Sequence, residues 1–547
     1  MEDSLQQIHQ TLQEQSQDRK RESTGESYRE NCVQPASLLP QGDVTISLPE
    51  NPEENCDDSI AIFPMENFDQ NDQPDLPPPQ ILEALKDMYF QHGHSWMNIL
   101  DASQFERNMF NPDQTILLHA LVVFGFKYWT DSFPDSRMRQ QYTDRSREKI
   151  LSLAVNEISF PSAQALAFLA FDALGQGPSS KTLNVMSLLT TAIGQLGLVR
   201  AVVEDNERRT ESPTRMVRSQ VHECRPRENE TVQQPCLFWT VYVLDRIIGV
   251  SHGFECRVAP NLFRRTVVDK DEVLTPARRV EVLISDVRTK TGRAGLSKSF
   301  CLLVEISTLI ERVNEFIMRP VNLRDFAQSQ EWKSHFRALD AALCSWKEAQ
   351  LATQQESLGE FDPVLTTCRA IFHTAIIRLQ SVAAFPPKTY SHFSASSLAP
   401  SRCEREIQSM CRLCESLQPS QYSSLGPLLV FAVWVAARNM VTLWTSGWEE
   451  RTSAVPPELT TLRETLCTLA EYWPCAQRFT AMIDLAVDAA NQANELSTLA
   501  IFNDVSKTAF GLQNVLGPRI QHNQGAEMAQ LWDLFSLPGI DGNNSFF

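Results

Sequence analysis

The sequence predicts an all-α protein, and three observations lead to this fold class. Apolar residues recur at the i, i+3 and i+4 spacing of amphipathic helices throughout the chain after residue 80. Only 20 of the 547 residues are glycine, so long segments can stay helical, whereas the 30 prolines must lie in linkers or near helix ends. No alternating apolar and polar run with hairpin turns stands out, which argues against a substantial sheet.

The first 80 residues form an acidic tail that we expect to be disordered. They contain 17 acidic and 4 basic residues, and therefore carry −13 of the net charge of −18. Such a composition cannot bury enough apolar surface to fold. From Asp43 to Gln80 acidic residues are interleaved with bulky apolar ones. This part is therefore either an activation segment that folds onto a coactivator or a solvated acidic linker.

A helical body begins at residue 81. Its first stretch places Ile81, Leu82, Leu85, Met88 and Tyr89 on one face of a helix. The same spacing recurs at 116–129, 163–174, 183–198, 236–250, 299–317, 336–351, 364–383, 403–417, 428–444, 459–472 and 482–501. The stretches 201–235, which is charged, and 386–402, which is rich in Ser and Pro, are expected to be surface loops. No period of 20–50 residues repeats, so a solenoid is not predicted.

The helical pattern divides the chain into four parts. After the tail at 1–80 come a first helical part at 81–320, a helical continuation of the same body at 321–517, and a polar C-terminal tail at 518–547. The last part contains a bulky apolar cluster around an aspartate, formed by Leu531, Trp532, Leu534 and Phe535. This cluster either docks as a helix in a coactivator groove, which would make it an activation segment, or folds back onto the helical body.

Three stretches of the first helical part resemble the middle homology region of fungal-specific transcription factors. They read ALKDMYFQHGHSWMNILDASQF at 84–105, ALAFLAFDALGQGPSSKTLNVMSLLTTAIGQLGLVRA at 165–201 and CLFWTVYVLDRIIGVSHG at 236–253. The positions that match the motifs of the second and third stretches are Gly175, Gly177, Gly197, Leu198, Arg200, Phe238, Trp239, Leu244, Asp245, Arg246 and Gly253. The chain departs from the family at Val199, where His is common, before Phe238, where basic residues are common, and after Gly253.

These motif residues are interpreted as packing and helix-end positions. Gly175 and Gly177 are expected to supply the positive φ angles that end a helix. Phe238 is expected to fill a core-facing stripe together with its aromatic neighbours. Asp245 and Arg246 point to different azimuths of a helix, so we expect each to reach a partner or a free helix end on a neighbouring element and not to pair with the other.

The resemblance implies an N-terminal module in which six cysteines bind two zinc ions and contact DNA. Such a module needs two CxxC pairs and two more cysteines within about 40 residues, but only Cys32 and Cys56 precede residue 200. The chain is therefore expected to have no DNA-binding residues of its own and to reach DNA only indirectly, through a DNA-binding partner. Alternatively, its gene model has lost an upstream exon.

No metal site, cofactor or catalytic residue is predicted. The CxxC pair Cys411 and Cys414 lies with Cys403 in a helical stretch, where small buried hydrophobes are favoured over zinc ligands. His92 and His94, at i and i+2, do not share a helix face and are expected to flank a turn. P-loop, GxSxG, HExxH and GxGxxG motifs are absent from the sequence. The most apolar run, 428–437, is too short for a membrane span.

Together these observations favour a nuclear transcription regulator of fungal type without enzymatic activity. Its helical body would serve as a regulatory and protein-interaction domain for other transcription regulators or coactivators, with a homodimer as one allowed form. The acidic tail or the C-terminal cluster would make it an activator, and a metabolic or biosynthetic gene set is the expected target. The alternative is an all-α scaffold or small-molecule sensor without a direct transcriptional role.

Overall fold

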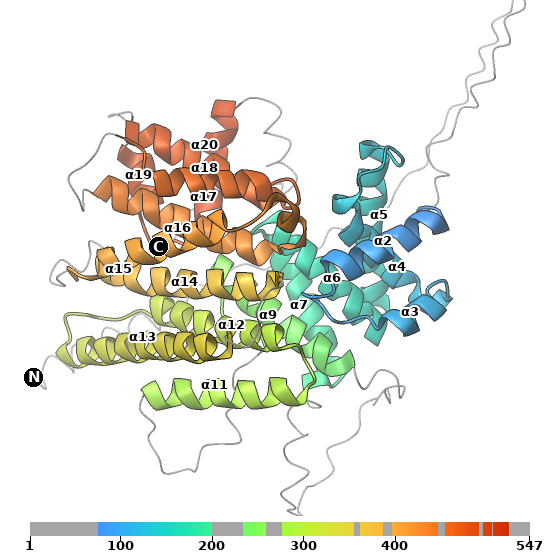
Figure 1. Cartoon of the computed structure of the whole chain (residues 1–547), viewed down its shortest axis with the longest axis horizontal. Coiled ribbons are helices and arrows are strands. Elements are labelled where there is room, and N and C mark those ends of the chain that lie inside the picture. The colour runs from blue at the N-terminus through green and yellow to red at the C-terminus, as the bar shows by residue number, and fades with distance from the viewer. Residues whose placement is uncertain are drawn as a thin grey trace, which may run out of the picture. The chain divides into compact units, whose positions relative to one another are not determined.

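The computed structural model describes residues 75–199, 233–258, 276–354, 361–386, 396–446, 454–491, 496–505 and 507–524. Within these ranges the regular structure is helical and no strand occurs, which confirms the predicted fold class. The chain from Asp72 onward forms one compact unit (Figure 1). Nearly all of the acidic tail, Arg200 and the whole Leu531–Phe535 cluster lie outside the described residues, so the expectations for them stay predictions.

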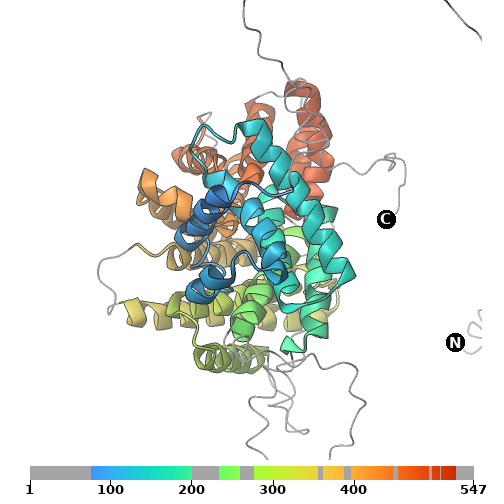
Figure 2. The same cartoon turned by 90° about the vertical axis from the view of Figure 1, so that its right-hand side faces the viewer.

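The first group of helices is built around α6, the helix Phe160–Gln176. Its neighbours in this group are α2 (Pro79–His92), α3 (Ala102–Asn108), α4 (Thr115–Gly125), α5 (Ser136–Asn156) and α7 (Ser180–Gln195), with 3-10 turns η1 (Pro112–Gln114) and η2 (Phe126–Tyr128). Ser159 caps α6 in a capping box with Ser162. Fifteen of its seventeen residues are buried, because α4, α5, α7 and later helices pack around it. Figure 2 shows this group facing the viewer.

The remaining helices form a two-layered stack. They are α9 (Gln233–His252), α11 (Pro276–Arg293), α12 (Lys298–Met318), α13 (Phe326–Gln354), α14 (Pro363–Ala384), α15 (Ala399–Glu415), η6 (Pro419–Ser424), α16 (Pro427–Ser446), α17 (Pro457–Leu469), α18 (Pro474–Asn491), α19 (Leu496–Phe502) and α20 (Ala509–Gln524). Proline opens several of them, where its missing N–H costs nothing.

One layer of this stack contains α9, α12, α14, α16 and α18 in that order, and α11, α13, α15 and α17 cover it (Figure 1). Hydrogen bonds show that α12 and α14 run parallel. Ser299 meets Asp362 where the two helices begin, and Asn314 meets Arg378 near their other ends. Although the sequence contains no repeat, the helices thus build a stacked array.

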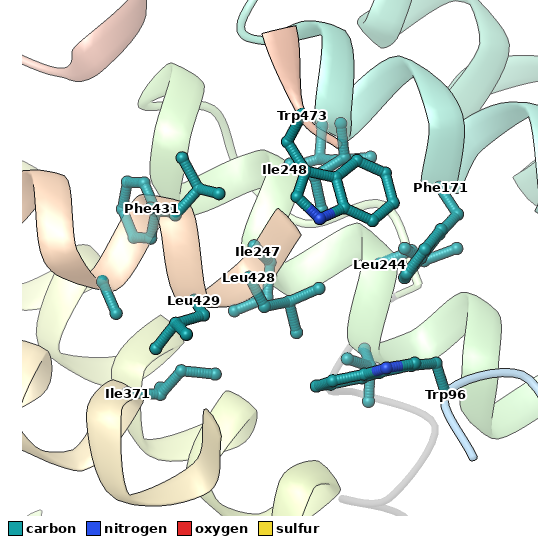
Figure 3. Close-up of a cluster of buried hydrophobic side chains, with 14 of the residues drawn as sticks. Trp96, Phe171, Leu244, Ile247, Ile248, Ile371, Leu428, Leu429, Phe431 and Trp473 are labelled. Carbon is teal, nitrogen blue, oxygen red and sulfur yellow. The ribbon is translucent and has the colours of Figure 1, made fainter. Parts of the chain in front are cut away.

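An apolar junction joins the first group of helices to the stack. Figure 3 shows the labelled side chains of this junction, which are Trp96, Phe171, Leu244, Ile247, Ile248, Ile371, Leu428, Leu429, Phe431 and Trp473. The indole N–H groups of Trp96 and Trp473 donate to consecutive backbone carbonyls, those of Ser424 at 3.0 Å and Leu425 at 2.9 Å. One turn before α16 therefore anchors tryptophans from distant parts of the chain.

Four features differ from what the sequence predicted. Helices α5 and α11 were not predicted at all. The expected stretch 482–501 consists of two helices, because α18 ends at Asn491 and α19 begins at Leu496. Helix α20 continues through Pro518 to Gln524, beyond the point at which a polar tail was expected to begin.

Helix α16 needs separate comment because it is long and apolar. Among the described helices it alone has the length and composition to cross a membrane, with a mean hydropathy of 1.5. However, 89% of its apolar window is buried inside the body. A helix that is apolar on all sides and covered by other helices is a core helix.

Candidate functional site

The motif helix α9 lies at the centre of the described body. Every residue from Cys236 to His252 is buried, including Phe238, Trp239 and Leu244. The helix packs on α6 and α7 on one side, and on α12 and α20 on the others. Burial on all sides explains why the matching motif is rich in aromatic and aliphatic residues.

Asp245 uses its carboxylate to hold the segment that follows α9. Its Oδ1 accepts the backbone N–H of Arg257 at 3.1 Å, and its Oδ2 accepts that of Val258 at 2.9 Å. The Sγ of Cys256 lies 3.7 Å from the carbonyl oxygen of Asp245. Residues 254–258 are thereby held against the helix they leave.

Arg246 is fully buried and is the centre of a charge cluster. Its Nη2 donates to the carbonyl of Val258 at 2.8 Å, and its Nε lies 3.2 Å from Oε2 of Glu311 on α12. The guanidinium also lies over the ring of Tyr242, 3.4 Å from the centroid. Asp245 and Arg246 therefore each reach a partner on a neighbouring element.

The expectation that Asp245 and Arg246 do not pair was wrong. Nη1 of Arg246 donates to Oδ2 of Asp245 at 3.2 Å. The two Cβ atoms do point to different azimuths, but the long arginine stem folds back over the ring of Tyr242, one turn earlier. This brings the guanidinium within reach of the adjacent carboxylate.

Burial and charge act in opposite directions on this cluster. Burial raises the pKa values of Asp245 and Glu311, and the Arg246 guanidinium opposes this shift in both. Burial also disfavours the charged form of Arg246, but Tyr242 and Glu311 outweigh it and raise the pKa of the guanidinium. The bonds of this buried cluster thus hold α9, α12 and the segment 254–258 together. Because its polar groups bind one another, it supplies structure and not a reactive group.

The motif glycines have two different physical roles. Gly177, Gly197 and Gly253 have φ angles of +108°, +70° and +79°, which residues with a side chain adopt only with strain. For Gly177 the prediction of a helix-ending glycine is confirmed. Leu198, beside Gly197, is buried as a core residue.

The predicted positive φ angle of Gly175 was wrong. This residue lies inside α6, and the residues with positive φ do not include it. A Cβ atom here would lie 2.2 Å from Cε3 of Trp473. The glycine is therefore needed because an indole from another part of the chain packs directly against the helix backbone.

The structure contains a second buried charge cluster, which the sequence analysis did not predict. Asp172 on α6 accepts two hydrogen bonds from Arg147 on α5, at 2.8 and 3.1 Å. The Nζ of Lys127 lies 3.7 Å from the same carboxylate and 3.9 Å from the ring centroid of Trp473. Burial lowers the pKa of Lys127 to about 8, although Asp172 opposes the shift. The one signal available in the sequence was an aspartate in the otherwise apolar stretch 163–174.

The cysteines of α15 are buried side chains with unreactive thiols. Burial raises the pKa values of Cys403, Cys411 and Cys414 to about 12. Within the part of the chain that the structure describes, no group of three or more His, Cys, Asp or Glu side chains is placed to hold a metal ion. His92 and His94 flank the turn at Gly93, as expected, and His92 stacks on Tyr128.

The class of protein follows from comparison with known families. Residues 87–348 match the family model of the fungal specific transcription factor domain. This range includes α9 with its buried charge cluster, and the match confirms the resemblance carried by the three motif stretches. The protein therefore carries a fungal specific transcription factor domain.

A relative named as a transcription protein supports the same class. The chain is 22% identical, over 375 residues, to the notoamide biosynthesis cluster transcriptional coactivator notQ' of Aspergillus versicolor. The alignment covers 66% of this chain and 71% of the relative. No solved structure matches the chain. The family and the relative together support a fungal transcription regulator, a class of protein that differs from enzymes.

Proposed function

We propose that this protein is a nuclear transcription coactivator that controls a metabolic or biosynthetic gene set through contacts with other regulators. The match of residues 87–348 to the transcription factor domain carries this proposal. The name of the relative, a coactivator of a biosynthesis cluster, supports the finer assignment. The charged groups of the buried clusters around Arg246 and Asp172 pair with one another inside the body. These internal bonds fix the helices relative to one another, as a domain that binds other proteins through a rigid surface requires.

Indirect contact with DNA is part of the proposal. The net charge of −18 opposes attraction to the phosphate backbone. Only Cys32 and Cys56 precede residue 200, which is too few for a cluster of six cysteines. In this proposal a DNA-binding partner brings the chain to its promoters, either as a heteromeric complex or with a homodimer of this chain.

A reporter assay tests the coactivator function. The full chain is fused to a foreign DNA-binding domain upstream of a reporter gene, and we expect transcription to rise well above that of the foreign domain alone. Parallel fusions of residues 1–80 and 518–547 ask whether either tail acts as the activation segment. If neither the full chain nor the tails raise reporter output, the coactivator proposal fails.

Two further measurements test the indirect contact with DNA. In a gel-shift assay at physiological salt, the purified chain should show no sequence-specific binding to its target promoters. Chromatin immunoprecipitation from its host should nevertheless recover those promoters, and the signal should disappear when the DNA-binding partner is deleted. Tight, sequence-specific binding by the purified chain would contradict this part of the proposal.

A further inference from the structure

Three bulky apolar side chains are exposed at one end of the helical stack. Phe254 follows α9, Met318 ends α12 and Phe326 begins α13, and they are 50%, 44% and 77% exposed. Single apolar residues are common on protein surfaces, but a group of them beside a pocket marks a place where another segment or molecule binds. This end of the stack therefore requires an explanation.

Contacts between α9, α12, α13 and α20 show that these positions lie at the same end. A Cβ atom at Gly253 would lie 3.5 Å from Cε of Met318 and 2.5 Å from Cγ2 of Thr508, the residue before α20. The ring centroids of Phe316 and Trp332 are 5.1 Å apart, which brings the end of α12 against the first turns of α13. The ends of α9 and α12 thus meet the beginnings of α13 and α20.

A pocket lies beside the exposed side chains, between the end of α12 and the first turns of α13. Its volume is about 60 Å³, and its lining includes the aromatic rings of Phe316 and Trp332 together with Val321. Arg319 and Glu331, which pair at 3.1 Å and are both about half exposed, also line it. One water needs about 10–15 Å³ of such space, so the pocket can take the end of one bulky apolar side chain.

A segment of this chain has matching side chains and sufficient reach. Helix α20 begins at this end of the stack, and its 16 residues span about 24 Å. From Gln524, where α20 ends, seven residues lead to Leu531, and an extended chain of this length spans up to about 25 Å. The Leu531–Phe535 cluster can therefore return along α20 to the end of the stack at which the helix begins.

We propose that the Leu531–Phe535 cluster folds back onto this end of the stack and places one bulky side chain in the pocket between α12 and α13. In a helical turn the spacing i, i+1, i+3 and i+4 puts its four apolar residues on one side and Asp533 on the other. The apolar side would cover Met318 and Phe326, and Asp533 would remain in solvent. While docked in this way, the cluster cannot present the same side to a coactivator.

Hydrogen exchange of the purified full chain, followed by mass spectrometry, tests the docking. The backbone amides of 531–535 should exchange at least tenfold more slowly than those of a synthetic peptide with the sequence of 525–547, because a docked segment must open before it exchanges. Exchange at the rate of the free peptide would overturn the proposal. The measurement uses the isolated chain, so its result does not depend on whether the protein is a coactivator.

Variants show whether the protection comes from this surface. Phe326→Glu and Met318→Glu should each remove most of the protection, and because both side chains are exposed, urea unfolding of the body should stay cooperative. Phe133→Glu, at a 59% exposed position in the segment before α5, is the matched control and should leave the protection unchanged. If the cluster stays protected in both Phe326→Glu and Met318→Glu, it docks elsewhere and the assignment is wrong.

A cross-link identifies the surface and the molecule that the cluster contacts. With p-benzoylphenylalanine in place of Phe535, irradiation of the full chain should join this position to residues 316–335 in a product of monomer size. A product of dimer size would show that the surface binds a second copy of the chain, and a cross-link to another region would show a different site. Either of these two results overturns the proposal.

Discussion

At the scale of single residues, Gly175 is required by a tryptophan far away in the sequence. It lies within α6, where alanine would ordinarily be the better helix former. The ring of Trp473 occupies the space that a Cβ would need. The indole cannot move freely, because its N–H binds the carbonyl of Leu425.

Replacing Gly175 with alanine should therefore destabilise the protein. We expect a loss of about 2–3 kcal/mol in the free energy of unfolding, typical of overpacking in a core. Gly194 on α7 is the matched control, since it is helical and a Cβ there meets nothing within 4 Å. Gly194→Ala should stabilise the protein by about 0.5–1 kcal/mol. Urea unfolding measures both changes, and equal effects at the two sites would contradict the packing argument.

Arg246 offers a second prediction at this scale. Arg246→Met should cost about 3–5 kcal/mol of unfolding free energy, because the carboxylates of Asp245 and Glu311 would stay buried without their cation. Adding Glu311→Gln to this variant should recover part of the loss. Arg319→Met, which removes an exposed pair with Glu331, should cost less than about 1 kcal/mol. A small loss in Arg246→Met would show that the cluster does not hold the helices together.

At the scale of elements, the sequence predicted apolar helices well and polar ones poorly. Helix α5 buries Tyr142, Ile150 and Ala154, but Thr143 and Ser146 complete its inward face. Because two positions of the buried face are polar, the i, i+3 and i+4 spacing of apolar residues is interrupted in this helix. Helix α11 was missed for a related reason, since seven of its eighteen residues are charged. Such helices form because neighbouring helices cover them, which a local pattern does not show.

The candidate site was predictable only in part. The motif residues of α9 were identified by resemblance, and their burial followed from their apolar character. The partners of Asp245 and Arg246 could not be predicted, because Val258 lies beyond the helix and Glu311 on another one. The cluster of Lys127, Arg147 and Asp172 could not be predicted either, because its three residues lie on different elements. Contacts between elements depend on how the helices pack, and helix periodicity does not determine this.

The junction of α7, α9 and α20 should respond to pH. Nε2 of His252 accepts the backbone N–H of Ser179 at 3.0 Å, while the other ring nitrogen lies 2.8 Å from the carbonyl of Ile248. Burial lowers the pKa of His252 to about 4, despite these backbone hydrogen bonds. Between pH 6.5 and 4 the unfolded chain therefore binds a proton that the folded chain excludes. Stability should be full above pH 6.5 and decline as the pH falls toward 4.

The contribution of His252 to this decline should be up to about 3 kcal/mol. Urea unfolding at a series of pH values measures it, and His252→Gln should flatten the slope in this window. His119, whose burial also lowers its pKa to about 4, should contribute a second share that His119→Gln removes. An unchanged slope in both variants would show that other groups control the acid sensitivity.

At the scale of the whole molecule, the family match stops before the folded unit does. It ends at residue 348, whereas the compact unit continues through α14 to α20. These later helices supply the partners of Trp96 and of the C-terminal end of α6, through the carbonyl of Ser424 and the side chain of Arg478. The matched region alone would leave its apolar junction uncovered.

Truncation tests this dependence. A fragment of residues 75–354 should bind a hydrophobic dye and unfold without a cooperative transition, because α14 and α16 no longer cover α12 and the junction. A fragment of residues 75–524 should retain a single sigmoidal transition in urea. If the shorter fragment unfolds as cooperatively as the longer one, the transcription factor domain is self-sufficient and the later helices form a separate unit.

The hydrogen bond between Trp96 and Ser424 has a consequence for how the protein is made. Its two ends are 328 residues apart in the chain. At a translation rate of about 5–20 residues per second, roughly 15 to 65 seconds pass after Trp96 is synthesised before its partner exists. During this interval the newly made helices expose apolar surface on the ribosome. The supply of this regulator should therefore depend on chaperones that protect nascent chains, and cells short of them should accumulate less of it.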